Sequence, residues 1–250
     1  MPLKEKKKSL DIAGATITYR IWRPGKHRRL LVLVHGMASN MSRWSEFVEN
    51  TELTKTWDII RLDLRGHSES VFRGKIGLRE WSLDLGELLD VERYQDCLVV
   101  GHSLGAQLAM YYATHYPSRV TGVCLIDPLI HEALYPAKKR IYQTRIIIWA
   151  FIGLVRLFNM IGFKRKNLPL RDLRQLDVET RIEIEKTGNM EDFVDKYGSP
   201  WPDLKQFPIS NYLKEIIVSL SPVPGFKSVK IPVLALLARV PTYTNPQLTS

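Results

Sequence analysis

The sequence predicts an α/β fold, with a mostly parallel β-sheet and helices on both faces. Five short apolar runs have the pattern of strands buried on both faces, and they alternate with segments of helical character. The five runs cover residues 30–34, 57–62, 97–100, 120–126 and 233–237. Such alternation is typical of parallel strands joined by right-handed crossovers. With 250 residues and 45% hydrophobic content, the chain can bury one substantial core, so we expect a single domain with an insertion.

The remaining elements follow from the same patterns. Residues 11–22 alternate between apolar and polar side chains, which indicates a strand or hairpin at an antiparallel edge, closed by the turn pair Pro24-Gly25. Helices are expected over residues 43–53, 78–89 and 104–115.

The alternation stops between residues 129 and 230. About 100 residues without a clear buried strand are too many for a loop and predict an insertion of their own, which we interpret as a helical cap over the carboxyl edge of the sheet. The sequence therefore divides into three parts. Residues 1–128 form the N-terminal part of the core, residues 129–230 form the cap, and residues 231–250 return to the core.

Charge and cysteine content narrow the class of protein. The net charge is +10, but the basic residues are scattered, with no recognition helix or aromatic-basic pattern, so no nucleic-acid partner is expected. Cys97 and Cys124 lie in apolar runs, which favours free thiols in a reducing compartment. The solvated basic start at Lys4 to Lys8 argues against a secretory signal, and we expect a cytoplasmic protein. No carboxylate-histidine spacing suits a metal, and no cofactor is expected.

The segment from Gly101 to Gly105 (Gly-His-Ser-Leu-Gly) carries the candidate chemistry. A hydroxyl at the tip of a sharp strand-to-helix turn needs small residues two positions to either side, and Gly101 and Gly105 supply them around Ser103. The following helix places its N-terminal amides beside Ser103, so the Leu104 N–H is a candidate oxyanion donor. A second donor is the Met37 N–H, because Gly36 lets that backbone approach.

These motifs resemble those of the α/β-hydrolase fold superfamily, in its serine esterase and lipase-like branch. The resemblance rests on HGM at 35–37, DLRGHSES at 63–70, GHSLGA at 101–106 and CLIDP at 124–128, and weakly on IPVLALLA at 231–238. The first four motifs fall within residues 17–128, where the similarity is close, although Ser68 stands where the family usually has glycine. The resemblance implies hydrolysis of carboxylic esters through an acyl-enzyme on Ser103, with His102 part of the elbow and without a catalytic role.

The resemblance also implies a histidine base after the last strand and an acid before that histidine. The six histidines are His27, His35, His67, His102, His115 and His131. None follows the last predicted strand, so we expect the family's final helix, strand and histidine loop to be missing, and the activity to be weak or absent. Asp127 is the candidate acid, with a turn-forming role before Pro128 as the alternative. A truncated form and a non-catalytic protein with a binding role both stay open.

Within the predicted cap, residues 146–155 form the most apolar run of the chain, with basic clusters before and after it. Ten apolar residues are too few to span a bilayer of about 30 Å. Two interpretations remain: a cap helix that lines an apolar acyl pocket, and an interfacial helix that contacts anionic lipid through residues 138–166. Both predict a small ester substrate with an apolar acyl or alcohol part.

Overall fold

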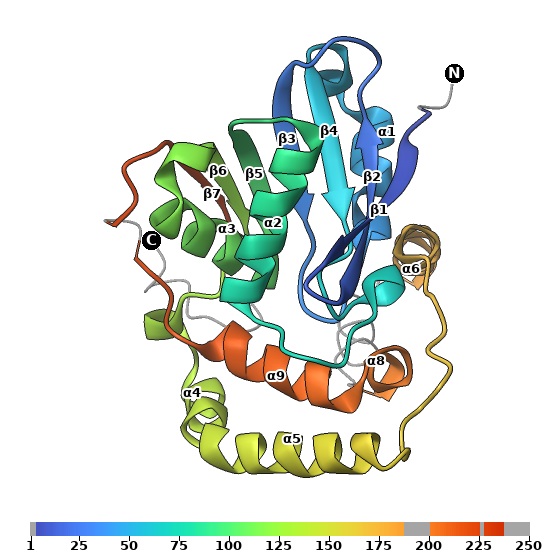
Figure 1. Cartoon of the computed structure of the whole chain (residues 1–250), viewed down its shortest axis with the longest axis vertical. Helices are drawn as coiled ribbons and strands as arrows, with labels where there is room; N and C mark the ends of the chain where they lie inside the picture. The colour runs from blue at the N-terminus through green and yellow to red at the C-terminus, as the bar shows by residue number, and fades with distance from the viewer. Residues whose placement is uncertain (1–3, 188–200, 226–227, 238–250) are drawn as a thin grey trace.

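A computed structural model describes residues 4–187, 201–225 and 228–237 of the chain. Its seven strands form one sheet in the order β1-β2-β4-β3-β5-β6-β7 (Figure 1). The strands are β1 (Lys6–Ile12), β2 (Ala15–Trp22), β3 (Arg29–Val34), β4 (Trp57–Leu62), β5 (Cys97–His102), β6 (Val120–Ile126) and β7 (Val233–Leu236). The pairs from β4 through β7 are parallel, and β1 and β2 are antiparallel. The predicted class, a mostly parallel sheet with helices on both faces, is confirmed.

The central strands are buried on both faces, which explains their continuous apolar runs. Along β3, Leu30, Val32 and Val34 belong to one hydrophobic cluster. The residues between them, Leu31 and Leu33, belong to a second cluster on the opposite face. Helices α2 (Leu78–Glu92) and α3 (Leu104–His115) cover the first face, and α1 (Ser45–Asn50) covers the second (Figure 1).

The N-terminal basic segment differs from its prediction, because much of it is a strand. The hairpin expected over residues 11–22 is present, but its first strand, β1, already begins at Lys6. Lys7 forms an ion pair with Glu69, which follows β4, and Lys8 forms one with Glu92, at the end of the helix over Leu78–Glu92. β1 is an edge strand of the described sheet, so its backbone is paired on one side only. Lysines on such a strand are a common protection against the addition of another strand.

The helix expected over residues 43–53 is broken into three short pieces. A 3-10 turn (Met41–Trp44) precedes α1, and a second 3-10 turn (Glu52–Lys55) follows it. Thr51 adopts an extended conformation that ends α1, and its hydroxyl accepts the N–H of Leu53 at 3.3 Å to begin the next turn. Local side-chain capping therefore overrides the helical pattern.

Between β6 and β7 the described residues form helices, which we call the cap helices. They are α4 (Pro136–Gln143), α5 (Arg145–Met160), α6 (Leu173–Thr187), α8 (Trp201–Gln206) and α9 (Ile209–Leu220). In Figure 1, α9 crosses the end of the sheet toward which the parallel strands point, and α5 packs along α9 on the side away from the sheet. Within the described ranges, no single helix is long and apolar enough to cross a membrane, and α4 and α5 meet that test only jointly, across a 53° bend.

Strand β7 was expected to be buried on both faces, and this expectation is wrong. Its residues Val233 to Leu236 are all exposed. The reason is its place in the sheet: in the part of the chain that the structure describes, β7 is the edge strand and pairs with β6 alone.

Candidate active site

Ser103 lies at a strained turn between β5 and α3. Its backbone dihedrals are φ 52° and ψ −113°, a positive φ that few residues other than glycine adopt, and α3 begins at the next residue. A Cβ atom added to Gly101 would lie 2.2 Å from the Gly105 carbonyl oxygen, and one added to Gly105 would lie 2.5 Å from the Val34 carbonyl oxygen. Both glycines are therefore required by close backbone packing, and the half-buried Ser103 side chain is held at the start of a buried helix.

Loops from three neighbouring strands meet at this serine. After β3, an added Cβ on Gly36 would lie 3.3 Å from the Ser103 Cβ atom, so that backbone passes directly beside the serine. After β6, the Ile126 carbonyl accepts the Ser103 N–H at 2.8 Å, which brings the next residue, Asp127, into the adjacent loop. Asp127 has a φ of 47° and donates its own N–H to the Leu236 carbonyl at 2.8 Å. The sheet order β3-β5-β6 thus brings together residues distant in sequence.

The two N–H groups predicted as oxyanion donors both belong to residues beside Ser103. Leu104 is the first residue of α3, so its N–H has no acceptor within the helix and lies at the positive end of the helix dipole. Met37 directly follows Gly36 in the loop after β3. The next N–H along that loop, of Ala38, is already donated to the Glu215 carboxylate at 3.0 Å.

The histidines near this turn are held in other contacts. The Nε2 atom of His35 accepts the Leu64 N–H at 3.1 Å, and its Nδ1 lies 2.9 Å from the Gly36 carbonyl oxygen. Burial, with the neighbouring His67, holds the pKa of His35 well below its usual value. The Nδ1 atom of His131 lies 2.6 Å from the Leu220 carbonyl oxygen at the end of α9.

His102, directly before Ser103, is half-buried. Burial and the charge of Arg43 lower the pKa of His102, while the charge of Asp127 opposes this shift. Its Nδ1 atom has no hydrogen-bond partner within the described ranges. No hydrogen bond found among the described residues joins the Ser103 hydroxyl to a histidine ring.

Sequence reasoning missed a polar stripe on α9 that faces the loops after β3 and β4. Asn211, Glu215 and Ser219 recur every four residues along an otherwise apolar helix and are buried. Asn211 donates to the Phe72 carbonyl at 2.7 Å, and the Ser219 hydroxyl lies 3.7 Å from the Met37 sulfur. The signal was present in the sequence, because polar residues spaced by four on an apolar face are typical of a surface that meets polar groups.

Glu215 of this stripe forms a fully buried ion pair with His67, in the loop after β4. Glu215 Oε2 lies 3.1 Å from His67 Nε2, and both side chains have no exposed surface. Burial alone would lower the pKa of His67, but the charge and hydrogen bonding of Glu215, with the charge of Asp63, raise it above its ordinary value. The pair joins the loop after β4 to α9, and Glu215 also fixes the loop after β3 through Ala38.

Other polar groups are structural or unreactive. Gln107 on α3 donates to the carbonyls of Leu129 at 3.1 Å and Ser219 at 2.6 Å, which ties both ends of the cap helices to the core. Burial raises the pKa of the Cys97 thiol to about 12, so a thiolate at that position is disfavoured. Among the residues that the structure describes, no three His, Cys, Asp or Glu side chains come together as a possible metal site.

A mostly parallel sheet whose β5 ends in a serine of positive φ, directly before a buried helix, is the arrangement of the α/β-hydrolase fold. The chain belongs to the α/β-hydrolase fold superfamily, and its residues 29–152 match the family described as "alpha/beta hydrolase fold".

Curated relatives and solved structures agree with this assignment. "Monoacylglycerol lipase ABHD6" from Homo sapiens is 30% identical over 114 residues, which cover 42% of this chain and 32% of the relative. "Protein phosphatase methylesterase 1" from Bos taurus is 30% identical over 118 residues, covering 44% of this chain and 30% of the relative. The matched part is thus about a third of these relatives' length.

Two solved structures share the fold over nearly the whole chain. A hydrolase from Pseudomonas aeruginosa PA01 superposes with a TM-score of 0.62 at 19% identity, covering 96% of this chain and 83% of that one. The "Thioesterase Domain From Curacin Biosynthetic Pathway" superposes with a TM-score of 0.63 at 15% identity, covering 98% and 86%. At these identities the superpositions establish the fold alone.

Proposed function

We propose that this chain is a serine hydrolase of carboxylic esters with an apolar acyl or alcohol part, and that Ser103 is its nucleophile. The observation that carries the proposal is the backbone of Ser103, whose positive φ projects a half-buried hydroxyl at the N-terminus of α3. Strain of this kind persists only where surrounding structure enforces it, and here Gly101 and Gly105 allow the necessary backbone contacts.

The chemistry proposed for the site is acyl transfer in two steps. The Ser103 oxygen attacks the ester carbonyl carbon, the bond to the alcohol oxygen breaks, and the alcohol leaves with a proton. The N–H groups of Met37 and Leu104 would stabilise the negative oxygen of the tetrahedral intermediate. Water then attacks the acyl-enzyme, which releases the carboxylic acid and restores the Ser103 hydroxyl.

The step for which this site offers no identified group is the removal of the Ser103 hydroxyl proton. A serine hydroxyl is a poor nucleophile without a base, and the 250 residues contain no histidine after His131. We assign Asp127, in the loop after the neighbouring strand β6, as the acid that would orient such a histidine. We therefore expect the 250-residue polypeptide to turn over slowly, because a serine without a hydrogen-bonded base retains only binding and oxyanion stabilisation.

The apolar character of the substrate is a proposal supported by the cap helices and by the names of two relatives. Helix α5, which packs on α9, is the most apolar of the helices that the structure describes. The relatives are named a monoacylglycerol lipase and a methylesterase, and both names denote ester hydrolysis. Because the chain matches only about a third of either relative, their activities are transferred to it only as a hypothesis.

A series of p-nitrophenyl esters of increasing acyl length, compared with acyl thioesters, tests the proposal. We expect slow hydrolysis that depends on Ser103, rises with acyl length and disappears in Ser103→Ala. Ser68→Ala is the matched control, because Ser68 is also a half-buried serine with a positive φ, in the loop after β4. Equal rates in Ser103→Ala and the parent would reject Ser103 as the nucleophile, and preference for thioesters would change the substrate class.

A non-catalytic binding protein is the second candidate, favoured by the finding that no hydrogen bond among the described residues joins the Ser103 hydroxyl to a histidine ring. Under this alternative the oxyanion site binds a carbonyl or carboxylate ligand without turnover. Titration with a non-hydrolysable amide analogue of the best ester distinguishes the two, because binding without any Ser103-dependent hydrolysis fits the second candidate alone.

A further inference from the structure

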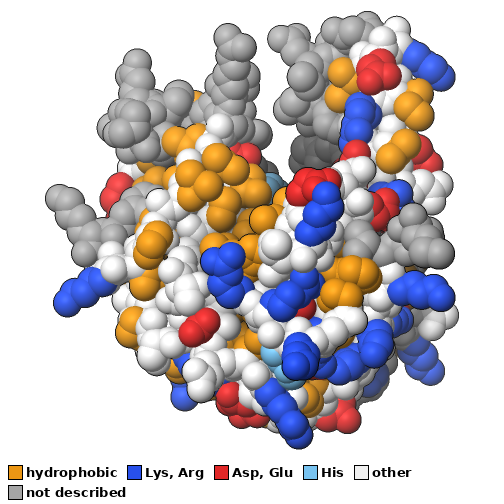
Figure 2. Space-filling model, turned by 90° about the horizontal axis from the view of Figure 1, so that it is seen from above, with side chains coloured by type: hydrophobic (Ala, Val, Ile, Leu, Met, Phe, Trp, Pro, Cys, Tyr) orange, Lys and Arg blue, Asp and Glu red, His pale blue; other side chains and the backbone are white. Residues whose placement is uncertain are grey.

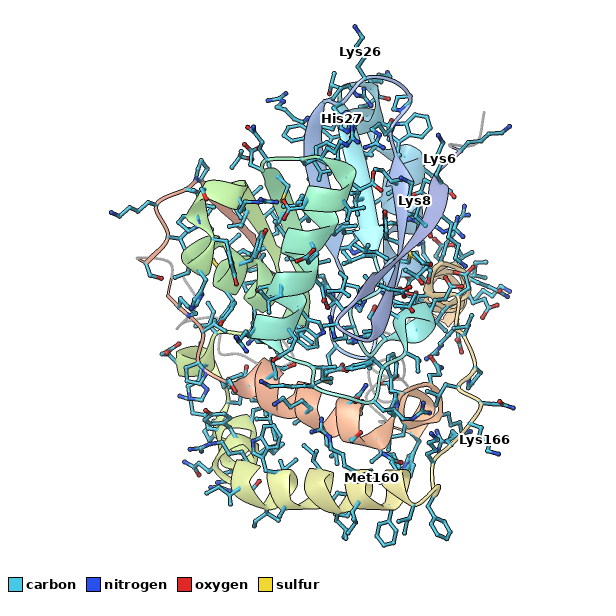
Figure 3. All side chains as sticks on the ribbon, viewed as in Figure 1. Lys6, Lys8, Lys26, His27, Met160 and Lys166 are labelled. Carbon is cyan, nitrogen blue, oxygen red and sulfur yellow. The ribbon has the colours of Figure 1, made fainter. Side chains whose placement is uncertain are left out.

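Helix α5 is the outermost helix beyond α9, and it exposes large apolar side chains on the side that faces away from α9. Its inner side packs on α9, where Ile152 is only 1% exposed. Its other side, which we call the outer face, consists of Ile146, Ile147, Phe151, Leu154, Leu157 and Met160. These side chains are between 47% and 82% exposed, and in Figure 3 the side chains of α5 project away from the rest of the molecule near the label of Met160. A helix that is apolar on all sides normally has a covering on all sides.

The charges of α5 lie on the inner side instead of the outer one. Its charged residues, Arg145 and Arg156, are both half-buried. Arg156 donates to the Gly74 carbonyl at 3.0 Å, and the ammonium group of Lys214 on α9 lies 3.7 Å from the centre of the Trp149 ring. The outer face therefore presents no charged side chain to water, although a helix on a hydrated surface usually turns its charges outward.

The segment that contains α5 is basic throughout. Residues 133–171 include no Asp or Glu. The basic residues of this segment are Lys138, Lys139, Arg140, Arg145, Arg156, Lys164, Arg165, Lys166 and Arg171. They gather before and after the apolar helix, and Lys164, Arg165 and Lys166 are exposed. At the opposite end of the molecule, Figure 2 shows Lys and Arg side chains scattered among acidic and hydrophobic ones.

A basic hollow adjoins the C-terminal end of the outer face. Its volume is about 440 Å³, and its lining includes four cationic side chains, those of Arg73, Lys75, Arg156 and Lys164. Met160, which belongs to the outer face, also lines it. Lys75 is paired with Glu80 at 3.0 Å, but Glu80 does not line the hollow. An anionic group at this position would meet positive charge from three separate segments.

We propose that the outer face of α5 docks on an anionic phospholipid bilayer and that the basic hollow receives the phosphate of one lipid headgroup. The 16-residue helix would lie in the plane of the interface, since it is only about 24 Å long and its charges flank or back the apolar face. Because α9 lies between α5 and the carboxyl end of the sheet, docking turns the Ser103 end of the molecule toward the lipid (Figure 1). The inference goes beyond the proposed hydrolase activity and does not depend on it.

Co-sedimentation with vesicles tests the docking. The 250-residue chain is mixed with vesicles of phosphatidylcholine alone, or of phosphatidylcholine mixed with phosphatidylserine, whose negative surface potential attracts basic segments. We expect binding to the anionic vesicles at low salt, weaker binding in high salt, and little binding to neutral vesicles. Added inorganic phosphate at millimolar concentration should compete weakly, because it lacks the apolar contact.

Two matched pairs of variants separate the apolar and the ionic parts. Leu157→Ser on the outer face should weaken partitioning about tenfold, and Leu83→Ser, on the exposed side of α2, should leave it unchanged. Lys164→Gln in the hollow should weaken it about fivefold, and Lys26→Gln, at the far end of the molecule in Figure 3, should not. Ser103→Ala should bind as the parent does, which separates this test from that of the hydrolase activity.

The outcomes that overturn the inference are distinct. Absence of sedimentation with anionic vesicles rejects lipid docking. Equal binding to neutral and anionic vesicles, or equal effects of Lys164→Gln and Lys26→Gln, rejects the headgroup site. A stable dimer in light scattering that Leu157→Ser converts to a monomer, without vesicle binding by either protein, identifies a second copy of the chain as the partner and overturns the lipid surface.

Discussion

The neighbouring helices α9 and α5 place their polar and apolar residues in opposite ways. Helix α9 buries Asn211, Glu215 and Ser219 against the loops after β3 and β4, and the first of these loops passes beside Ser103. Helix α5 packs on the other side of α9 and exposes its large apolar side chains. A protein surrounded only by water gains stability from the reverse arrangement, in which the apolar residues are inside and the polar ones outside.

The difference indicates that both arrangements have uses other than stability. Buried polar groups on α9 satisfy and position backbone groups at the candidate site, as Glu215 does for Ala38. Exposed apolar groups on α5 suit an environment less polar than water. Substitutions on the two helices should therefore differ strongly in their effect on folding, and the following four experiments use that contrast.

The largest effect is expected for Glu215→Ala. It leaves a buried His67 without its partner and removes the acceptor of the Ala38 N–H, so the free energy of unfolding should fall by about 3–5 kcal/mol. Urea denaturation followed by circular dichroism measures the change. A loss as small as that of an exposed substitution on α5 would mean that the α9 stripe does not hold the site together.

Ile152→Ala, on the inner side of α5, should cost somewhat less. The side chain is buried against α9, and its truncation removes apolar contact and leaves a cavity, which corresponds to about 2–4 kcal/mol. The same denaturation experiment applies. A negligible change in the free energy of unfolding would mean that α5 does not pack on α9 in solution. The contrast between the two helices would then be wrong.

The pH dependence of stability should separate His67 from His35 and His102. The pKa of His67 is raised in the folded state, so its stabilising contribution is complete below about pH 6.5, the unfolded value, and is lost as the pH rises through the folded pKa. His35 and His102 have lowered pKa values, so their contribution is present above about pH 6.5 and is lost at lower pH. Unfolding free energies from pH 5 to 9 should pass through a maximum. In His67→Gln the decline on the alkaline side should shrink, and an unchanged decline would exclude this histidine as its source.

The smallest effect is expected for Leu157→Ala on the outer face. Its side chain is 55% exposed, so the free energy of unfolding should change by no more than about 0.5 kcal/mol. Thermal or urea denaturation, run beside Ile152→Ala, provides the comparison within one helix. A destabilisation equal to that of Ile152→Ala would show that the outer face is covered in the free protein.

Much of the core could be predicted because its signals are local. Strands β4 and β6 and helix α3 have the bounds that the apolar patterns predict, since each is defined by its own periodicity and flanking turns. The strained turn at Ser103 was equally visible, because the need for glycine at 101 and 105 arises within five residues. Helix α1 was predicted too long because the Thr51 hydroxyl accepts a backbone N–H that would otherwise form a helical hydrogen bond. The spacing of apolar residues does not reveal such a bond.

The rest of the site depends on contacts between distant segments. Glu215 and His67 are 148 residues apart, and nothing in either local sequence indicates that one meets the other. The proximity of Asp127 to Ser103 follows from the order β5-β6 in the sheet and was inferred only through the family resemblance. The exposure of β7 likewise depends on sheet order, because an apolar run of four residues has the same pattern at an edge as in the centre.

The central claim is that the Ser103 hydroxyl is the reactive group of this protein. Prolonged incubation with a fluorophosphonate probe, followed by digestion and mass spectrometry, identifies the modified residue and its rate of labelling. We expect a single adduct on Ser103, formed slowly because no described histidine is hydrogen-bonded to its hydroxyl, accelerated by raising the pH, and absent from Ser103→Ala. An adduct on another serine with Ser103 unmodified would contradict the assignment of the nucleophile. Labelling at the rate of an ordinary serine hydrolase would contradict the expectation that Ser103 reacts without the help of a base.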